Sequence, residues 1–263
     1  MARTPGPLAI VLAASTMLVT GCGSEVDRAS APGKAELGGE ITVSAAASLT
    51  EAYTEIGRDF EAANPGTTIR FNFDSSGALA RQILDGAPVD VYASADEADM
   101  AELTEAGLIE DEPTVFARNR LAIVTQPANP TAIATLADLA DAGVIALCAE
   151  TAPCGTIAAQ VLARAGVSIP ESRVTRGQSV KPTLTAVSEG DAVAGIVYVT
   201  DAASAGGAVA TVAIPEDQNA IATYPVGVLT DAANPDVARA FADHVASDDA
   251  LLVLKELGFL PPS

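Results

Sequence analysis

Four helix starts in this chain are built from serine, threonine and other small residues that directly follow a predicted strand or loop. Such a start presents unpaired backbone N–H groups and the positive end of the helix dipole, which together attract an anion. Hydroxyl groups at these positions add further hydrogen-bond donors. We therefore expect the four starts to bind an anion if the fold brings them together. They lie at Ser48, at Asp74-Ser75-Ser76-Gly77, at Thr151-Ala152-Pro153-Cys154-Gly155-Thr156 and at Gln178-Ser179-Val180-Lys181-Pro182.

Each start also has a plainer interpretation, because hydroxyl residues are ordinary helix caps. Ser48 and Glu51 have the S-x-x-E spacing of a capping box, in which the two side chains close the helix start. Ser76 fits simple capping in the same way, and Val180 fits ordinary helix packing. Both interpretations stay open for any single start, and it is the recurrence that favours an anion site.

Strand and helix patterns alternate from residue 40 onward, which is typical of an α/β protein with mostly parallel sheets flanked by helices. Ligands in such folds bind at the carboxyl ends of strands, where helices begin. We expect strands at Glu40–Ala45, Thr68–Phe73, Val89–Ala93, Leu121–Thr125, Val144–Cys148, Val193–Tyr198 and Tyr224–Leu229, and helices at Ser48–Ala63, Ser76–Asp85, Glu97–Ala106, Thr135–Ala140, Gly155–Ala165, Pro182–Glu189, Pro235–Ala246 and Ala250–Leu257.

Two of these strand regions, Arg120–Thr125 and Ala222–Leu229, lie beside prolines and polar loops and are predicted to cross between two lobes. Lobe 1 would comprise residues 40–122 and 223–263, and lobe 2 residues 123–222. Two crossings make a hinge, and two of the four helix starts fall in each lobe. The sequence therefore predicts a two-lobed molecule with an anion held in the cleft between the lobes.

The composition indicates a large folded core and a strongly acidic surface. Of 263 residues 49% are hydrophobic, and 34 acidic residues against 14 basic ones give a formal net charge of −20. A surface of that charge repels nucleic acid and anionic lipid headgroups, so we exclude both as partners. We expect a monomer that needs no cofactor.

The N-terminus has the pattern of an export signal. Arg3 precedes an apolar run from Leu8 to Val19 that is short for a membrane span. Val19-Thr20-Gly21-Cys22 resembles the lipobox of bacterial lipoproteins, in which the cysteine is acylated and becomes the first residue. We expect residues 1–21 to be a lipoprotein signal peptide and residues 22–39 a flexible tether. The mature protein would then lie on the outer face of the cytoplasmic membrane, on the periplasmic or cell-wall side, held by lipid alone.

The two remaining cysteines, Cys148 and Cys154, form the second feature that depends on export. In an exported protein this pair predicts a disulfide, with two free buried thiols as the alternative. A metal site is not expected, because the single histidine, His244, is far from them in the sequence.

The sequence does not support an enzyme. A serine hydrolase needs a base, yet His244 lies in a late helical pattern and no G-x-S-x-G elbow occurs. The cysteine pair lacks the C-x-x-C spacing of thiol–disulfide enzymes, and neither a P-loop nor a zinc signature is present. A lipid-anchored adhesion or structural module would leave the recurring helix starts unexplained.

Several motifs in order resemble the periplasmic molybdate-binding proteins of ABC importers, over about residues 40 to 260. That resemblance implies a type II periplasmic binding protein whose lobes close on molybdate or tungstate and deliver it to an ABC permease with its ATPase subunit. The motifs are Ala45-Ala46-Ala47-Ser48-Leu49-Thr50, Ser75-Ser76-Gly77-Ala78-Leu79-Ala80-Arg81-Gln82-Ile83, Gly86-Ala87-Pro88-Val89-Asp90-Val91, Gly195-Ile196-Val197-Tyr198 and Tyr224-Pro225-Val226.

Carried over by motif, the resemblance implies five oxyanion ligands. Ser48 and Ser76 would bind through hydroxyl and backbone N–H, Cys154 and Val180 through backbone N–H, and Tyr198 through its phenol. The cysteine at 154 departs from the small non-thiol residue of the family pattern. The alternative for Tyr198 is a strand-end tyrosine with its ring in the core.

A site made only of donors has a definite selectivity. Molybdate is an unprotonated dianion at neutral pH, whereas phosphate retains a proton and would need an acceptor. A missing hydrogen bond in a dry site costs roughly 1–3 kcal/mol, which disfavours phosphate. Sulfate is also unprotonated, so only the size of the cavity can exclude it. A binding protein for sulfate, thiosulfate or another oxyanion therefore stays the alternative.

Overall fold

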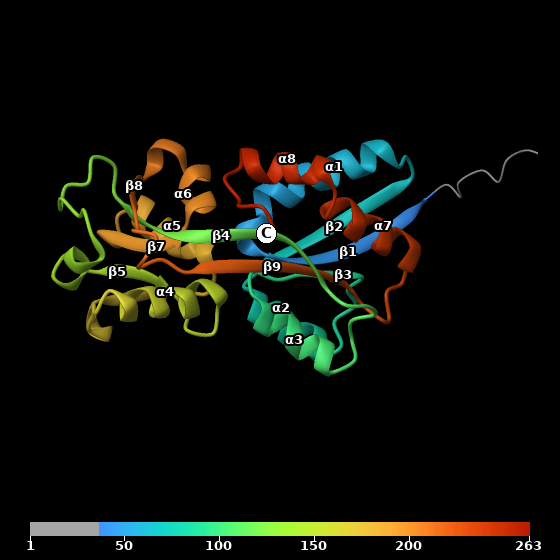
Figure 1. Ribbon diagram of the computed structural model, residues 1–263, viewed down its shortest axis with the longest axis horizontal. Helices are drawn as coiled ribbons and strands as arrows, with labels where there is room; N and C mark the ends of the chain where they lie inside the picture. The colour runs from blue at the N-terminus through green and yellow to red at the C-terminus, as the bar shows by residue number, and fades with distance from the viewer. Residues whose placement is uncertain (1–36) are drawn as a thin grey trace, which may run out of the picture. The chain divides into compact units, whose positions relative to one another are not determined.

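The strands form one mixed sheet in the order β2-β1-β3-β9-β4-β7-β5-β6, with β8 beside β4 (Figure 1). This computed structural model describes residues 37–263, so the export signal, Cys22 and the tether up to residue 36 lie outside the described residues. The strand bounds are β1 Gly39–Ala46, β2 Thr67–Asp74, β3 Val91–Ala93, β4 Thr114–Thr125, β5 Ile145–Cys148, β6 Val174–Gly177, β7 Ala194–Tyr198, β8 Ala210–Ala213 and β9 Ile221–Val228.

The long strand β4 belongs to both halves of the sheet. Its residues from Thr114 to Arg120 pair with β9, and those from Leu121 to Thr125 pair with β7 and β8. We call the half that contains β1, β2, β3 and β9 lobe 1, and the half that contains β5 to β8 lobe 2. The change of partner lies close to the predicted boundary at residue 122, and the exact lobe bounds stay a prediction.

Parallel pairing holds inside each half but not at the crossings. β1 is parallel to β2 and β3, and β5 is parallel to β6 and β7. β4 and β9 are antiparallel to each other. β4 is also antiparallel to β7 and β8, and β9 is antiparallel to β3. One of these strands leaves lobe 1 and the other returns to it, so they run in opposite directions. The predicted mostly parallel sheet is thus a mixed sheet.

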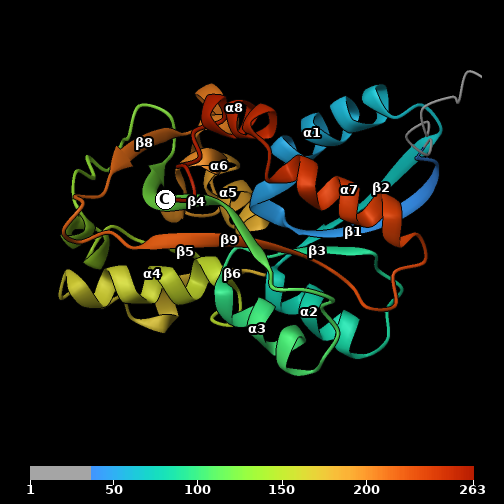
Figure 2. The ribbon, with the colours of Figure 1, turned by 45° about the vertical axis from the view of Figure 1, so that its right-hand side comes forward.

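Helices cover both faces of each half. In lobe 1, α1, α7 and α8 lie on one face and α2 and α3 on the other, and α4, α5 and α6 pack on lobe 2 (Figures 1 and 2). The helix bounds are α1 Thr50–Ala63, α2 Ser76–Leu84, α3 Glu97–Glu105, α4 Pro153–Arg164, α5 Val180–Ser188, α6 Val199–Ser204, α7 Pro235–Val245 and α8 Asp248–Glu256, with short 3-10 turns η1 Ala47–Leu49, η2 Leu136–Ala140, η3 Glu171–Arg173 and η4 Gly206–Ala208.

Helix α1 shows why the apolar spacing produces this packing. Tyr53, Ile56 and Phe60 recur at helical spacing, and each is at most 3% exposed. The rings of Tyr53 and Phe60 pack edge-to-face on Phe241 of α7, at centroid distances of 6.0 and 5.4 Å. Burying three large side chains on one face anchors the helix, and with it the η1 turn that precedes it.

The described residues, 37–263, include no helix that combines the length and the apolar character of a membrane span.

Candidate anion-binding site

The five residues predicted to bind an oxyanion all line one pocket. Lobe 1 contributes Ser48 and Ser76, and lobe 2 contributes Cys154, Val180 and Tyr198. The space between the walls is about 200 Å³, including its opening to solvent. The other described residues that line it are uncharged as well: Ala46, Ala47, Ser75, Ala95, Pro153 and Ser179.

The order of strands and helices explains why these residues meet. Strand β1 leads directly into η1, and short connections join β2 to α2, β5 to α4 and β6 to α5. Parallel pairing places the ends of neighbouring strands side by side, since Ala46 pairs with Asp74 and Cys148 pairs with Gly177. Each helix start therefore projects from the same edge of its half-sheet, where ligands of α/β folds bind.

Three of these starts have no side-chain cap. No described side chain caps η1, α4 or α5, whose N-cap residues are Ala46, Ala152 and Ser179. The N–H groups of a first helical turn have no partner inside the helix. Those of Ser48, Cys154 and Val180 are thus left for a ligand in the pocket.

The capping interpretations of Ser48 and Ser76 are wrong. The Ser48 hydroxyl lies 3.0 Å from the Tyr224 hydroxyl and caps no helix start. At α2 the cap is Ser75, whose Oγ accepts from the N–H of Ala78. The Ser76 Oγ instead accepts from the N–H of Ala95 at 2.9 Å. Both serine hydroxyls are therefore free of a capping role.

Tyr198 supplies the buried hydroxyl of the pocket. The side chain is 1% exposed, and its hydroxyl has no hydrogen-bond partner among the described residues. Burial raises the pKa of Tyr198 well above its ordinary value, so the phenol stays protonated at neutral pH. A buried donor without a partner costs free energy unless a ligand accepts from it. The ring is buried in the core, as the alternative prediction for Tyr198 stated, and the residue also lines the pocket.

The predicted disulfide joins Cys148 to Cys154. It links the end of β5 to the first turn of α4. The sulfur of Cys154 is used in this bond, so the group that Cys154 can offer to a ligand in the pocket is its backbone N–H. The next residue must be glycine, because a Cβ on Gly155 would lie 2.0 Å from the carbonyl oxygen of Ala149. The bond and the close approach together fix this helix start.

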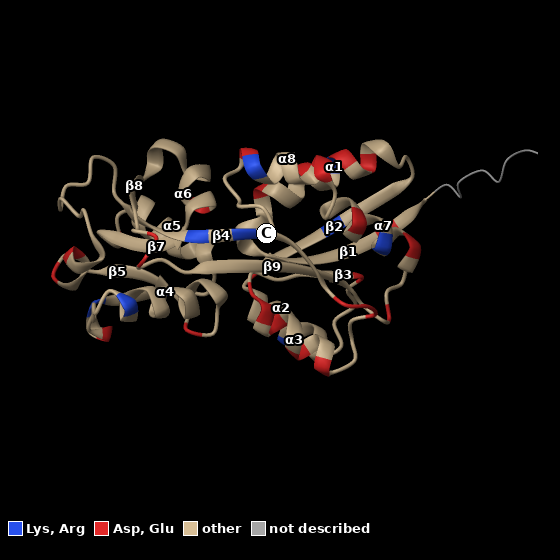
Figure 3. Cartoon of the chain, viewed as in Figure 1, with Lys and Arg blue, Asp and Glu red and all other residues tan. Residues whose placement is uncertain are grey.

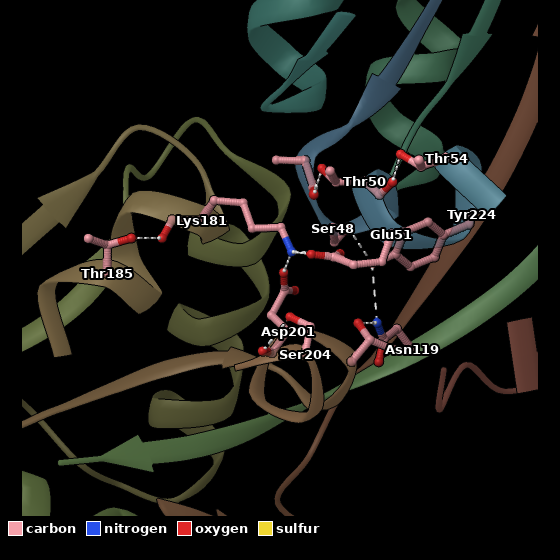
Figure 4. A network of polar contacts seen from close by, with 12 residues as sticks. Ser48, Thr50, Glu51, Thr54, Asn119, Lys181, Thr185, Asp201, Ser204 and Tyr224 are labelled. Atoms are coloured by element: carbon pink, nitrogen blue, oxygen red, sulfur yellow. Dashed lines mark hydrogen bonds and ion pairs between the residues drawn. The ribbon is translucent and has the colours of Figure 1, made fainter. Parts of the chain in front are cut away.

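Charged groups lie beside the pocket, where they pair across the two lobes (Figure 4). Lys181 of α5 donates to both carboxylate oxygens of Glu51 of α1 at 2.7 Å, and its Nζ is 2.9 Å from Asp201 Oδ1. Burial raises the pKa of Asp201 to about 6, although Lys181 opposes the shift. Glu51 is thereby held against Lys181, away from the backbone donors of its own helix start.

Residues 37–263 contain no group of three or more His, Cys, Asp or Glu side chains that could hold a metal ion. The described residues that line the pocket offer hydroxyl and N–H donors and no carboxylate. Such a lining suits a small anion without protons.

A family comparison agrees with this geometry. The family described as bacterial extracellular solute-binding protein matches residues 41–260, which include all five predicted ligands. The chain belongs to this family.

Relatives of this solute-binding protein share both its length and its fold. Molybdate-binding protein ModA of Mycobacterium tuberculosis (strain ATCC 25618 / H37Rv) is 38% identical over 252 residues, covering 94% of this chain and 96% of that protein. The Azotobacter vinelandii periplasmic molybdate-binding protein matches with a TM-score of 0.74 and 20% identity, covering 85% of this chain and 100% of that one. The sulfate-binding protein SubI from Mycobacterium tuberculosis H37Rv has a TM-score of 0.77 and 20% identity, covering 84% of this chain and 86% of that one. At 20% identity, the two structures show the two-lobed fold alone.

Sequence reasoning missed the residues behind the pocket of this solute-binding protein. Asn119 and Tyr224 are fully buried and contact Ser48 directly or through one another. Tyr224 was visible only as part of a family motif in a crossing strand, and Asn119 gave no signal. The Ser75 cap and the Ala95 N–H on Ser76 were also not predicted.

Proposed function

We propose that this solute-binding protein captures molybdate, and tungstate with it, outside the cytoplasmic membrane and delivers it to an ABC permease with its ATPase subunit. The observation that carries the proposal is the pocket between the lobes. Among the described residues, no side chain caps three of its helix starts and none hydrogen-bonds the buried hydroxyl of Tyr198. The sequence identity with molybdate-binding protein ModA supports molybdate as the anion.

The donors explain the selectivity that we propose. Ser48, Ser76 and Tyr198 are neutral, and none of the described residues that line the pocket has a carboxylate to accept a hydrogen bond from a protonated ligand. A protonated oxyanion such as phosphate would leave its own donor without a partner, at a cost of about 1–3 kcal/mol in a buried site. Sulfate satisfies the same donors, so the size of the pocket must distinguish it.

The remaining parts of the proposal concern location and chemistry. The lipobox at Cys22 would hold the protein to the outer face of the membrane by lipid. The protein acts as a monomeric carrier with no cofactor and no catalytic step.

Titration calorimetry of the protein with molybdate, tungstate, sulfate and phosphate tests the proposal. We expect saturable heat and an increase in Tm with molybdate and tungstate, and neither with phosphate. The double variant Ser48→Ala with Ser76→Ala should lose most of this binding and remain folded by circular dichroism.

Failure to respond to any of the four anions, in a protein shown to be folded, would refute the proposal. A response to sulfate alone would reassign the ligand to the alternative oxyanion. Unchanged affinity in the double variant would mean that the anion binds elsewhere.

A further inference from the structure

Two buried polar side chains on the strands that cross between the lobes lead to Ser48 of the pocket (Figure 4). Asn119 is on β4 and Tyr224 on β9, and neither side chain is exposed to solvent. Neither lines the pocket. Their hydrogen bonds run toward Ser48, which does.

The backbone determines which of Asn119 and Tyr224 donates the hydrogen bond between them. Asn119 Oδ1 accepts from the N–H of Arg120 at 2.9 Å, which fixes the orientation of the amide. Its Nδ2 therefore faces the other way, where it donates to Thr200 Oγ1 at 2.9 Å and to the Tyr224 hydroxyl at 3.5 Å. An amide nitrogen only donates, so the Tyr224 oxygen accepts and its own proton must point elsewhere.

The Tyr224 proton has one described acceptor, the Ser48 Oγ at 3.0 Å. Burial raises the pKa of Tyr224 well above its ordinary value, so the phenol keeps that proton at neutral pH. Ser48 thus receives a hydrogen bond from behind, and its single proton is left to point into the pocket.

Ser76 is held in the same way by a different donor. The N–H of Ala95 donates to Ser76 Oγ at 2.9 Å, and a backbone amide cannot accept. The proton of Ser76 is therefore also directed to the pocket. Ser48 accepts from a side chain and Ser76 from the backbone, and both hydroxyls are thereby oriented as donors to the pocket.

We propose that Tyr224 and Asn119 are positioning residues that hold the Ser48 hydroxyl as a donor and so bias the pocket against oxyanions that carry a proton. The inference rests on the proposed function. A serine that is free to rotate can accept a hydrogen bond from monohydrogen phosphate as readily as it donates one to molybdate. With Tyr224 in place, turning Ser48 to give up its donor role leaves a buried proton without an acceptor.

The test is Tyr224→Phe, which removes the donor to Ser48 and keeps the ring. The centroid of that ring lies 5.5 Å from the ring centroid of Phe259 and 6.1 Å from that of Tyr198. At pH 8 we expect molybdate to bind about tenfold more weakly, the effect of losing one buried hydrogen bond. Phosphate should compete with molybdate better than in the wild type. The dissociation constant for phosphate divided by that for molybdate should therefore fall by more than tenfold.

Tyr53→Phe is the matched control. Tyr53 is a fully buried tyrosine of lobe 1 whose hydroxyl has no partner among the described residues, and it does not line the pocket. Both affinities should stay unchanged in this variant. If Tyr224→Phe fails to fold, Asn119→Ser, which removes the donor to Tyr224, should narrow the ratio in the same direction.

The inference is overturned if Tyr224→Phe weakens molybdate and phosphate by the same factor, or if phosphate competes in neither protein. Either outcome would leave Tyr224 with a packing role only. A wild-type protein that does not bind molybdate would instead refute the proposed function, and that is measured before any variant is compared.

Discussion

Tyr198 illustrates how single residues of the site trade stability for binding. Its hydroxyl is buried in the pocket wall without a partner among the described residues. An unsatisfied buried hydroxyl costs about 1–3 kcal/mol. A bound oxyanion would accept this hydrogen bond and remove the cost, so the residue favours the ligand-bound protein over the ligand-free one.

Tyr198→Phe should therefore change stability and affinity in opposite directions. Without ligand, we expect the free energy of unfolding to rise by about 1 kcal/mol, because a buried polar group without a partner is lost. The affinity for molybdate should fall at least about tenfold, because the donor is lost. Urea denaturation and calorimetry measure the two quantities.

Tyr53→Phe separates the two effects in this experiment too, since it removes an unpartnered buried hydroxyl away from the pocket. It should stabilise the protein and leave binding unchanged. If Tyr198→Phe binds molybdate as tightly as the wild type, the phenol is not a ligand.

At the residue scale, the sequence predicted the groups that line the pocket but not those behind it. The four helix starts follow from a local pattern, whereas the choice of Ser48, Ser76, Cys154, Val180 and Tyr198 as ligands follows from the family resemblance. The contact of Tyr224 with Ser48 joins positions 176 residues apart. Such a contact depends on which strands cross between the lobes, and no local pattern encodes that.

At the element scale, most strands and helices were predicted, but β6, β8 and α6 were not, and β4 was predicted to start at Leu121 instead of Thr114. Length does not explain the missed strands, because β3 and β5 are as short and were predicted. Every residue of β3 and β5 is buried, whereas β6 and β8 have no fully buried residue and so show no apolar run in the sequence. The segment Thr135–Ala140, predicted as a helix, is instead the 3-10 turn η2. Its buried residues Leu136 and Leu139 are three apart, the repeat of a 3-10 turn.

Helix α2 of lobe 1 also closely approaches the loop before α4 of lobe 2. A Cβ added to Gly77 would lie 2.8 Å from the carbonyl oxygen of Thr151 and 3.2 Å from Asp99 Oδ1. The backbone of Thr151 cannot yield without moving its loop. The glycine therefore lets the two lobes approach this closely around the pocket.

Gly77→Ala should oppose the approach of the lobes and leave the stability of lobe 1 nearly unchanged. Alanine favours a helix over glycine by about 0.5–1 kcal/mol, which offsets the close contact with Asp99 inside lobe 1, so the free energy of unfolding should change little. We expect the affinity for molybdate to fall about tenfold or more, as measured by calorimetry.

The control for this variant is Gly207→Ala, whose added methyl group would meet nothing within 4 Å. It should bind molybdate like the wild type. Equal affinities for Gly77→Ala and Gly207→Ala would mean that the contact with Thr151 does not limit binding.

At the scale of the whole molecule, the charge and the site oppose one another. The chain carries a formal net charge of −20, and acidic residues are spread over its helices (Figure 3). This field repels an anion at long range, although salt screens it beyond about 10 Å. The attraction must therefore come from short-range donors in the uncharged pocket and from the dipoles of the helix starts around it.

The alternation of strands and helices predicted the class of the fold. It did not predict that β4 and β9 run antiparallel, because alternation says nothing about the direction in which a strand crosses. That direction places Asn119 and Tyr224 behind the pocket, and so it matters for the site as well as for the fold.

Anomalous diffraction from crystals grown with molybdate tests the central claim most directly, since molybdenum is located by its own scattering. We predict one strong molybdenum peak in the pocket between the lobes, within hydrogen-bond distance of the hydroxyls of Ser48, Ser76 and Tyr198. A peak at another place on the molecule, or none at saturating molybdate, would contradict the account.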